Sequence, residues 1–469
     1  MSPDQILAEL AERRRQDLPT HGGRTLAYVY DSGLAAADEV GRQALSMYAS
    51  ANGLDPTAFP SLLSMEADLV AFARRHLHAG DEVVGTVTSG GTESILLAVQ
   101  TARDAAGVER PAMVVPSTIH AAFAKAAHYF GVELVAVPVG AEHRADVPAM
   151  TEAIDTLGDR VVLVAASTPS YAHGVIDPIE ELAAVTRARG LRLHVDACIG
   201  GWILPWTPDA APWDFAVPGV TSLSVDLHKY AYTPKGVSLL LHADAGLRRP
   251  QFFAYADWPG YTMLNSTMQS TKSGGPLAAA WAVVNLIGSD GYRGLVEHTL
   301  AGTRALADGI EAIDHLHLVE RPDTSLVVVG TDDAVDVFTI SDLMLDRGWF
   351  VQPQMRFGDE PANLHLTISA ATADSVPEFL TALREAVDEA ALAGPVRIDP
   401  ALAEAAATLD PDTLDDEAFD GLLALAGLAG GDGQVAVPDR LGPVNALVDV
   451  APPRVREALM VAFLDRLTR

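Results

Sequence analysis

Apolar and polar positions alternate in blocks between residues 61 and 290. Short runs rich in β-branched residues, apolar on both faces, are separated by longer stretches with the spacing of amphipathic helices. Strands that are buried on both faces and joined by helices are typical of an α/β layer with a mostly parallel sheet. The expected strands are 83–88, 113–116, 134–139, 161–166, 191–195, 222–225 and 237–241. The expected helices are 93–105, 121–130, 147–157, 178–189 and 277–286.

The chain on either side of this α/β domain has other patterns. Residues 1–60 contain one helix and then irregular chain with several glycines and prolines. Residues 291–395 contain strands and helices in mixed order, which predicts a smaller C-terminal α+β domain. Residues 396–469 are rich in Ala, Leu and Asp and predict an acidic helical tail, which closes with a helix over 453–467. In residues 291–395 the expected strands are 326–329 and 364–368, and the expected helices are 337–347 and 376–390.

Composition narrows the classes of partner. The 469 residues include 62 acidic and 32 basic side chains, a net charge of −30. Such a surface repels nucleic acid and anionic membranes, so neither is expected as a partner. No apolar run approaches the roughly 20 residues that span a bilayer, and the N-terminus lacks the apolar core of a signal peptide. One cysteine, Cys198, cannot form an internal disulfide, so we expect a soluble protein in the reducing cytoplasm.

Lysine is scarce in this chain. Only four lysines occur, at positions 125, 229, 235 and 272, whereas arginine supplies the other 28 basic residues. A guanidinium does not lose its proton to become a nucleophilic amine, so arginine cannot replace a lysine that forms a Schiff base. The scarcity favours a chemical role for a retained lysine, although an ordinary surface role fits Lys125 equally well.

Two segments that follow predicted strands carry candidate ligand groups. Gly90, Gly91 and Thr92 lie between a strand and a helix, where glycines let the backbone approach an anion and helix N-terminal amides bind phosphate. A tight turn with a threonine cap explains the same residues nearly as well. Asp196 follows another strand, at the edge where open α/β sheets bind ligands. The alternative for Asp196 is a turn or capping aspartate.

A third segment also follows a strand and reads Ser224-Val225-Asp226-Leu227-His228-Lys229. Lys229 can form a Schiff base with an aldehyde cofactor, and a pocket of low dielectric constant would favour its neutral amine. Ser224 and His228 are placed to donate hydrogen bonds to a phosphate. The alternative is an ordinary exposed lysine, which the scarcity of lysine disfavours.

The order of glycine-rich loop, acid and lysine resembles fold-type I enzymes that depend on pyridoxal phosphate (PLP). The resemblance extends to the group II decarboxylase branch and is strongest to sphingosine-1-phosphate lyase-like proteins. It runs from about residue 50 to 290. The matching segments are TSGGTESILLA (88–98), HAAFAKAAHYFGVEL (120–134), HGVIDPIEEL (173–182), HVDACIGGWILPW (194–206) and GVTSLSVDLHKYAYTPKGVSLLL (219–241).

This resemblance implies roles for individual residues. It implies that His120 stacks on the PLP ring, that Asp196 binds the ring nitrogen and that Lys229 carries the cofactor. It also implies that Gly91, Thr92 and His228 hold the phosphate and that Tyr30 and Lys235 lie near an amino substrate. Family members are dimers with active sites at the interface, so a homodimer with shared sites is expected.

Two segments depart from the family pattern. Where the lyases carry a histidine that contacts the substrate phosphate, this chain has Asp55, which would repel a phosphate or, alternatively, turn away before Pro56. Where the family reads Gly-Ser-Arg-Pro-Gly, this chain has residues 270–274 with Thr271, which keeps a hydroxyl for the cofactor phosphate. No metal site is expected, because the paired histidines at 76/78 and 315/317 lack neighbouring carboxylate or cysteine partners in the sequence.

The expected reaction is breakage of a carbon–carbon bond in an amino substrate bound to PLP as a Schiff base (an external aldimine). Loss of CO2 would make the protein an amino-acid decarboxylase, whereas Cα–Cβ cleavage would make it an aldehyde-lyase. The resemblance favours the lyase and Asp55 favours the decarboxylase. An aminotransferase would need a carboxylate-binding arginine, for which Arg356 is the candidate. A non-catalytic PLP-fold binding protein would be expected to lose Lys229 or Asp196, and a nucleotide-binding protein would need neither.

Overall fold

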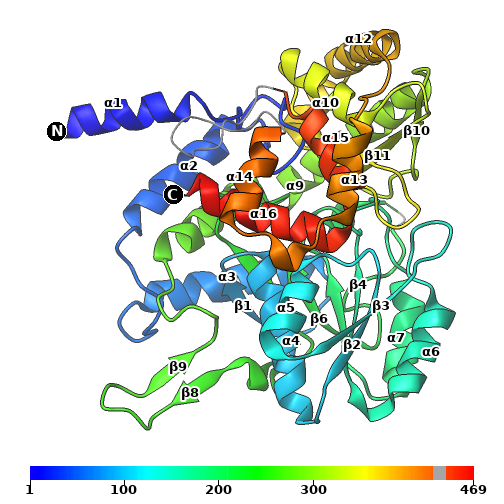
Figure 1. Cartoon of the computed structure of the whole chain (residues 1–469). Coiled ribbons are helices and arrows are strands. Elements are labelled where there is room, and N and C mark those ends of the chain that lie inside the picture. Colours follow the sequence, from blue (N-terminus) through cyan, green and yellow to red (C-terminus); the bar gives the residue numbers. More distant parts are fainter. Residues whose placement is uncertain (209, 426–439, 469) are drawn as a thin grey trace.

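The computed structural model describes residues 1–208, 210–425 and 440–468, and its centre is a seven-stranded sheet (Figure 1). The strand order is β1-β7-β6-β5-β4-β2-β3, and only β7 runs antiparallel to its neighbours. The strands are β1 (Val84–Thr88), β2 (Ala112–Pro116), β3 (Glu133–Val137), β4 (Val161–Ser167), β5 (Leu193–Asp196), β6 (Val220–Val225) and β7 (Ser238–His242). The predicted α/β layer with a mostly parallel sheet is confirmed, with strand ends shifted by two residues at most.

Helices cover both faces of this sheet. In β2, Val114 packs into one hydrophobic layer, whereas Met113 and Val115 pack into the other, as the alternation of side chains along a strand requires. The first layer includes side chains of α3, α6, α7 and α9, and the second includes those of α4 and α5. The helices of this region are α3 (Pro60–His76), α4 (Gly91–Ala106), α5 (Ala122–Phe130), α6 (Val147–Leu157), α7 (Ile179–Ala188), α8 (Ala245–Arg248) and α9 (Gly274–Glu311).

A smaller antiparallel sheet follows, in the order β10-β11-β13-β12. Its elements are β10 (Leu316–Leu318), β11 (Leu326–Thr331), α10 (Val337–Asp346), β12 (Gln352–Gln354), β13 (Asn363–Thr367), α11 (Ala370–Asp374) and α12 (Val376–Ala393). The N-terminal segment completes this region: Leu26 donates its N–H to the Phe350 carbonyl (2.9 Å) and accepts the Thr367 N–H (2.7 Å). The Leu26 side chain is fully buried in the same core. The predicted smaller α+β region is confirmed.

In the part that the structure describes, the C-terminal segment forms four α-helices, which lie across the front of the molecule in Figure 1, coloured orange to red. They are α13 (Pro400–Thr408), α14 (Asp416–Leu425), α15 (Gly442–Val450) and α16 (Pro453–Leu467). Asp342 of α10 accepts the backbone N–H groups of Leu441 (3.0 Å) and Gly442 (2.8 Å). Helix α16 covers the range of the predicted closing helix, 453–467. Helix α15 begins at the residues whose backbone N–H groups Asp342 binds.

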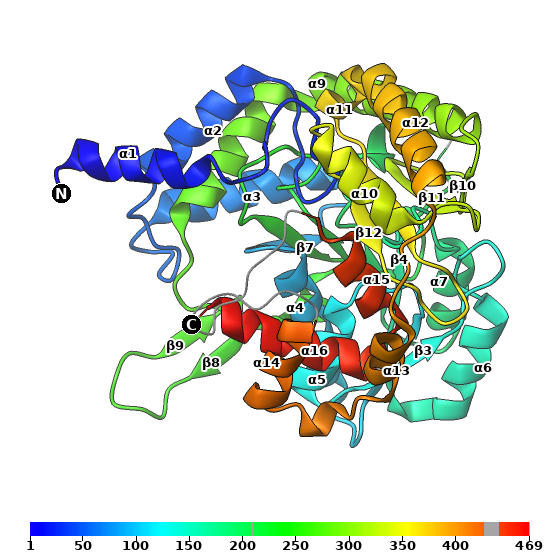
Figure 2. The same cartoon turned by 45° about the horizontal axis from the view of Figure 1, so that its top comes forward.

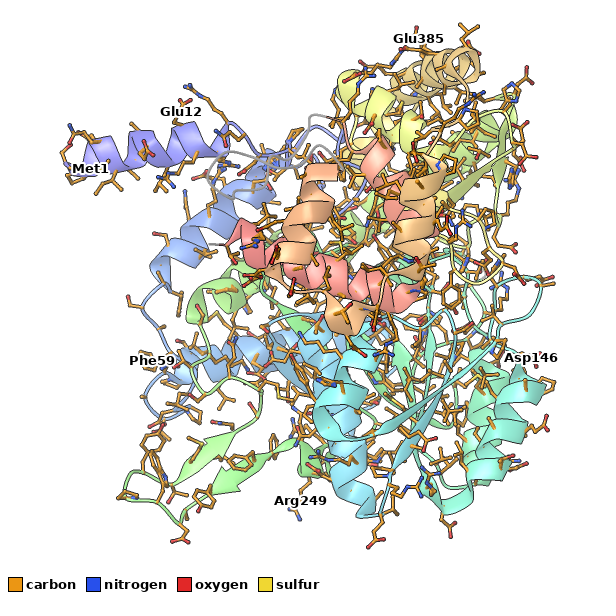
Figure 3. All side chains as sticks on the ribbon, in the orientation of Figure 1. Met1, Glu12, Phe59, Asp146, Arg249 and Glu385 are labelled. Atoms are coloured by element: carbon orange, nitrogen blue, oxygen red, sulfur yellow. The ribbon has the colours of Figure 1, made fainter. Side chains whose placement is uncertain are left out.

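Three N-terminal and hairpin elements complete the description. They are α1 (Pro3–Arg14), α2 (Ala35–Met47) and the hairpin of β8 (Phe253–Tyr255) with β9 (Met263–Asn265). Helix α1 has no buried residue and stands clear of the body (Figure 2). Figure 3 labels Met1 and Glu12 along this projecting helix. Within the described residues, no helix has both the length and the apolar character needed to cross a membrane.

Candidate active site

A cavity of about 400 Å³ opens at the carboxyl ends of β1, β5 and β6. These three strands run in the same direction, because β7 is antiparallel to both β1 and β6. The loops that follow them therefore meet at one edge of the sheet, as open α/β sheets place their ligand sites. The cavity is lined by Ser89, Gly90, Gly91, Thr92, Glu93, Ile95, His120, Pro169, Tyr171, Asp196, Cys198, Ile199, Asp226, His228 and Lys229.

The N-terminus of α4 forms one wall of the cavity. Gly90 precedes the helix and Gly91 begins it, so the first amide groups of α4 have no partner within the helix. A β-carbon at Gly91 would lie 2.7 Å from Cys198 Sγ and 2.8 Å from a carboxylate oxygen of Asp226. Only glycine allows this approach, which leaves the helix N-terminus next to the strand-end residues.

Asp196 lies at the end of β5 and is 7% exposed. Its Oδ1 accepts the N–H of Cys198 (3.1 Å) and the hydroxyl of Ser224 (3.2 Å). The structure corrects the expected role of Ser224: this side chain is fully buried in β6 behind Asp196 and is not part of the cavity lining. Ser224 orients the carboxylate and does not reach a ligand phosphate.

Lys229 lies in the turn after β6, where its Nζ is 3.0 Å from Asp226 Oδ2. Burial by itself would lower the pKa of Lys229, but the combined charges of Asp226 and the other acidic groups around the amine outweigh burial and raise the pKa well above its ordinary value. The expectation that the pocket favours the neutral amine is therefore wrong for the protein without a cofactor. Sequence reasoning missed Asp226 as a functional residue, although its position three residues before Lys229 was visible.

Two histidines face the same cavity. His120 is otherwise exposed, and its Nδ1 accepts the N–H of Ala122 (3.1 Å), which leaves Nε2 as the protonated nitrogen of the neutral ring. His228 Nδ1 accepts the N–H of Val237 (3.2 Å), so its Nε2 points to the Asp226 side, 3.7 Å from Oδ2. Burial lowers the pKa of His228, although Asp226 opposes this effect. Both predicted histidines are thus in the site.

The two predicted substrate residues lie next to each other beside the cavity. Lys235 Nζ is 4.8 Å from the ring centroid of Tyr30 and donates to the His228 carbonyl (3.2 Å). The Lys235 side chain reaches the surface, yet the surrounding protein and then the charge of Lys229 lower its pKa to about 8. Burial raises the pKa of the Tyr30 hydroxyl. Neither Tyr30 nor Lys235 is among the residues that line the cavity; Lys235 adjoins it through the backbone of His228.

Asp55 and Thr271 lie outside the cavity lining. Asp55 is exposed, and its Oδ1 accepts the backbone N–H (2.8 Å) and the hydroxyl (2.6 Å) of Thr57. These contacts support the turn alternative for Asp55. The loop that holds Asp55 meets α3 at Phe59, which Figure 3 labels near the left edge of the molecule. Thr271 is exposed on a segment that pairs with Asn52 through its neighbour Lys272.

Arg356 is not brought to the cavity. Its Nε is 2.7 Å from Asp449 Oδ2, and its backbone N–H donates to Oδ1 of the same carboxylate (2.6 Å). Asp449 belongs to α15 and its side chain is 4% exposed. The guanidinium therefore attaches the C-terminal helices and has no place in a substrate-carboxylate site, which removes the basis for the aminotransferase alternative.

Sequence reasoning also missed Tyr171, which lines the cavity. Its ring stacks on His365 with centroids 4.1 Å apart, and its hydroxyl donates to Gln352 Oε1 (3.0 Å). Both partners belong to the small sheet, so Tyr171 joins the two sheets at the site. No local motif marks this residue, because its partners lie about 180 residues further along the chain.

The donor set of the cavity fits PLP, the cofactor that the resemblance implies. The amides at the start of α4 and the ring of His228 match a phosphate. Asp196 offers a buried carboxylate, which suits a protonated pyridine nitrogen. Lys229 offers the amine, and His120 offers a flat ring at the open side. The close approach at Gly91 keeps these groups together around one cavity.

The fold and this donor set define a fold-type I PLP-dependent enzyme. The pyridoxal-dependent decarboxylase conserved domain matches residues 40–330, and the chain belongs to that family. It is 34% identical to sphingosine-1-phosphate lyase of Arabidopsis thaliana over 82% of this chain and 72% of that protein. It is 35% identical to sphingosine-1-phosphate lyase 1 of Rattus norvegicus, over 83% and 69%. The protein is thus a PLP-dependent lyase that acts on a small substrate.

Solved structures agree with this assignment. A sphingosine-1-phosphate lyase of Burkholderia pseudomallei superposes with a TM-score of 0.77 at 32% identity, covering 84% of this chain and 92% of that one. Glutamate decarboxylase of Lactobacillus brevis superposes with a TM-score of 0.73 at 20% identity, covering 85% and 95%, which shows the shared fold.

A second family pattern matches residues 400–466, the putative helix-turn-helix domain found at the C-terminus of pyridoxal-dependent enzymes. This range contains 12 acidic and 4 basic side chains, a net charge of −8. Binding to nucleic acid depends on neutralising phosphates with basic residues, so this charge does not support such a role.

Proposed function

We propose that this protein cleaves the Cα–Cβ bond of a 2-amino-3-hydroxy substrate and releases an aldehyde and a smaller amine. The observation that carries the proposal is Lys235 beside Tyr30, with a pKa lowered to about 8. This cleavage requires removal of the proton from the Cβ hydroxyl, and a base whose pKa lies near the working pH performs that task well. Decarboxylation has no corresponding hydroxyl proton to remove.

Bound PLP supplies the electron sink for the electron pair of the broken bond. The residues of the chain have distinct tasks around it. Asp196 would stabilise the positive charge of the ring nitrogen, the start of α4 would bind the phosphate and His120 would cover the ring. Lys235 would accept the hydroxyl proton as the Cβ–oxygen bond becomes a carbonyl, and Cα would gain one proton to complete the amine product, so the number of protons is unchanged.

Amino-acid decarboxylation is the second candidate. A probable L-tyrosine/L-aspartate decarboxylase of Methanocorpusculum labreanum is 33% identical over 65% of this chain. The Asp55 carboxylate was the sequence argument for this activity, but its hydrogen bonds to Thr57 turn it into its own loop. The contacts at residue 55 therefore give no reason to exclude a phosphorylated amino alcohol.

Product analysis separates the two candidates. The protein with PLP is incubated with long-chain 2-amino-3-hydroxyalkyl phosphates and, separately, with amino acids, and both aldehyde and CO2 are measured. We expect aldehyde from the amino alcohol; CO2 from an amino acid, with no aldehyde, would refute the proposal. Lys229→Ala should abolish covalent labelling of the chain by PLP and borohydride.

The role of Lys235 has a matched control in Lys125, an exposed lysine that packs on Tyr129. We expect Lys235→Met to lower kcat by about 10²–10⁴-fold, the usual contribution of a general base, while cofactor absorbance is kept. Lys125→Met should keep wild-type kcat. Equal activity of the two variants would show that Lys235 takes no proton.

We also infer that the enzyme is a homodimer with shared active sites. Thr271 is exposed and outside the cavity of its own chain, so a phosphate contact from Thr271 requires a second copy. The β8–β9 hairpin nearby exposes Phe253 (53%), Tyr255 (49%) and Tyr261 (55%), an aromatic surface that a partner would cover. Sedimentation velocity should give twice the chain mass; a monomer that is fully active would contradict the inference.

A further inference from the structure

Four side chains from distant parts of the chain meet at the junction of the two sheets. His143 follows β3, and His173 lies in the loop between β4 and α7. Glu360 lies between β12 and β13, and Glu320 lies just after β10. None of them lines the cofactor cavity, and no sequence motif links them. The cluster is a feature of the folded chain alone.

The polar atoms of this cluster converge on one point. Glu360 places one oxygen 2.9 Å from His173 Nε2 and the other 3.3 Å from His143 Nε2. The two imidazole rings stack with centroids 4.1 Å apart and planes 17° apart. One ligand atom from each of His143, His173 and Glu360 lies within 4.8 Å of the other two. Three donors at this separation can reach one ion after small rotations of their side chains.

Glu320 holds His143 in the orientation that a metal ligand needs. Its Oε1 is 2.8 Å from His143 Nδ1, so a proton on Nδ1 bonds the carboxylate, and Nε2, on the Glu360 side, is the nitrogen that would give its lone pair to a bound ion. A carboxylate behind a histidine in this way fixes the tautomer and raises the basicity of the ligand nitrogen. The structure therefore supplies both the ligands and the group that positions one of them.

The charge of the cluster and the backbone conformation of His143 also favour a binding site for a cation. The two carboxylates of Glu320 and Glu360 face the two stacked imidazoles. Neutral imidazoles are the form that binds metal, and a divalent cation would balance the two carboxylates. His143 also adopts a positive φ of 56°, a conformation that is strained for a non-glycine residue.

We propose that His143, His173 and Glu360 bind a divalent transition-metal ion, for which zinc is the natural probe, with Glu320 positioning His143. Two imidazole nitrogens, one carboxylate and a water complete the four positions that zinc prefers. The ion would join the loop of His173 to the small sheet. Because Tyr171 and Pro169 of the same loop line the cofactor cavity, the metal would stiffen one wall of the active site.

Titration of the chelator-treated holoenzyme with zinc tests the proposal. Calorimetry should show one ion per chain, zinc should raise the unfolding temperature, and cobalt in place of zinc should give the visible bands of a tetrahedral site. If the wild-type protein did not bind one equivalent of zinc saturably, that result alone would overturn the proposal.

Variants then locate the ion. His143→Ala and the nearly isosteric Glu360→Gln should each lose stoichiometric binding, and Glu320→Gln should weaken it about 10–100-fold. The matched control is His315→Ala, which removes a half-buried histidine 2.9 Å from Asp332, a pair that belongs to no three-ligand group among the described residues. This control should bind as the wild type does. Undiminished binding in both Glu360→Gln and His143→Ala would place the ion elsewhere and refute the site.

Discussion

Replacing Gly91 with alanine tests how closely helix α4 must approach the strand-end residues. The added carbon would lie 2.7 Å from Cys198 Sγ and 2.8 and 2.9 Å from the two carboxylate oxygens of Asp226. Neither neighbour can move freely, because both are buried and Asp226 also binds Lys229 (3.0 Å) and the hydroxyl of Ser238 (2.6 Å). The helix must therefore shift, and its N-terminal amides shift with it.

The size of the effect follows from two opposing contributions. Overpacking a tight interior costs about 1–3 kcal/mol, and three contacts below 3.0 Å place this case in the upper half. Alanine favours the helix over glycine by up to about 1 kcal/mol, which offsets part of that cost. We expect Gly91→Ala to lose about 2 kcal/mol of unfolding free energy. If the displaced amides also lost about 2 kcal/mol of binding free energy for the cofactor phosphate, PLP would bind about 30-fold more weakly.

The adjacent glycine gives the control. A β-carbon at Gly90 would lie 3.3 Å from His228 Cε1, and the φ of 163° is extended backbone that any residue adopts. Gly90→Ala should therefore change the free energy of unfolding by less than about 0.5 kcal/mol, as substitutions outside tight packing usually do. Urea unfolding without cofactor measures this free energy for both variants, and fluorescence titration measures PLP binding to Gly91→Ala. If Gly91→Ala matched the wild type, or if Gly90→Ala were equally damaging, the packing argument would be refuted.

Three further predictions concern charge. In Asp226→Asn without cofactor, burial is no longer opposed by that carboxylate, so the pKa of Lys229 should fall; the pH dependence of amine modification measures it, and an unchanged pKa would contradict the ion pair. Burial lowers the pKa of His365 to about 4, so between pH 6.5 and 4 the unfolded state binds a proton that the native state does not, and stability falls as the pH falls. His365→Gln should reduce the slope of unfolding free energy against pH by up to about 1.4 kcal/mol per pH unit in denaturant titrations. An unaltered slope would show that His365 does not cause the loss of stability at low pH. Asp449→Ala should free Arg356 and speed proteolysis within the C-terminal helices; wild-type cleavage rates would show that other contacts hold them.

The large sheet and the core of the site could be predicted from the sequence because their signals are local. Each buried strand is a short apolar run. Asp196 ends such a run, and Gly91 and Lys229 come within four residues of the end of one, so parallel strands bring the three residues to one edge. The register of the sheet then places the three segments around one cavity. Local pattern and chain direction were sufficient for this part.

The remaining features depend on contacts between distant residues, which no local pattern encodes. Ser224 alternates with Val225 along β6, but its neighbour across the sheet, Asp196, decides that it faces the carboxylate. Arg356 is occupied by Asp449, which lies 93 residues further on. The charge state of Lys229 also differed from expectation, because the effect of Asp226 depends on the distance between the two side chains and not on their order.

The strand-like contacts of the N-terminal segment with the small sheet constrain the order in which the chain can fold. Thr25 bridges to Phe350, 325 positions later, and Leu26 fills a core whose other members come from residues 306 onwards. During synthesis this segment leaves the ribosome long before its partner, because 325 positions separate Thr25 from Phe350. Long-range closures of this kind are slow, because the loop entropy is lost before the contact is gained. A small region expressed by itself would lack Leu26 and expose an apolar gap, so we expect the N-terminal segment and the small region to fold as one cooperative unit.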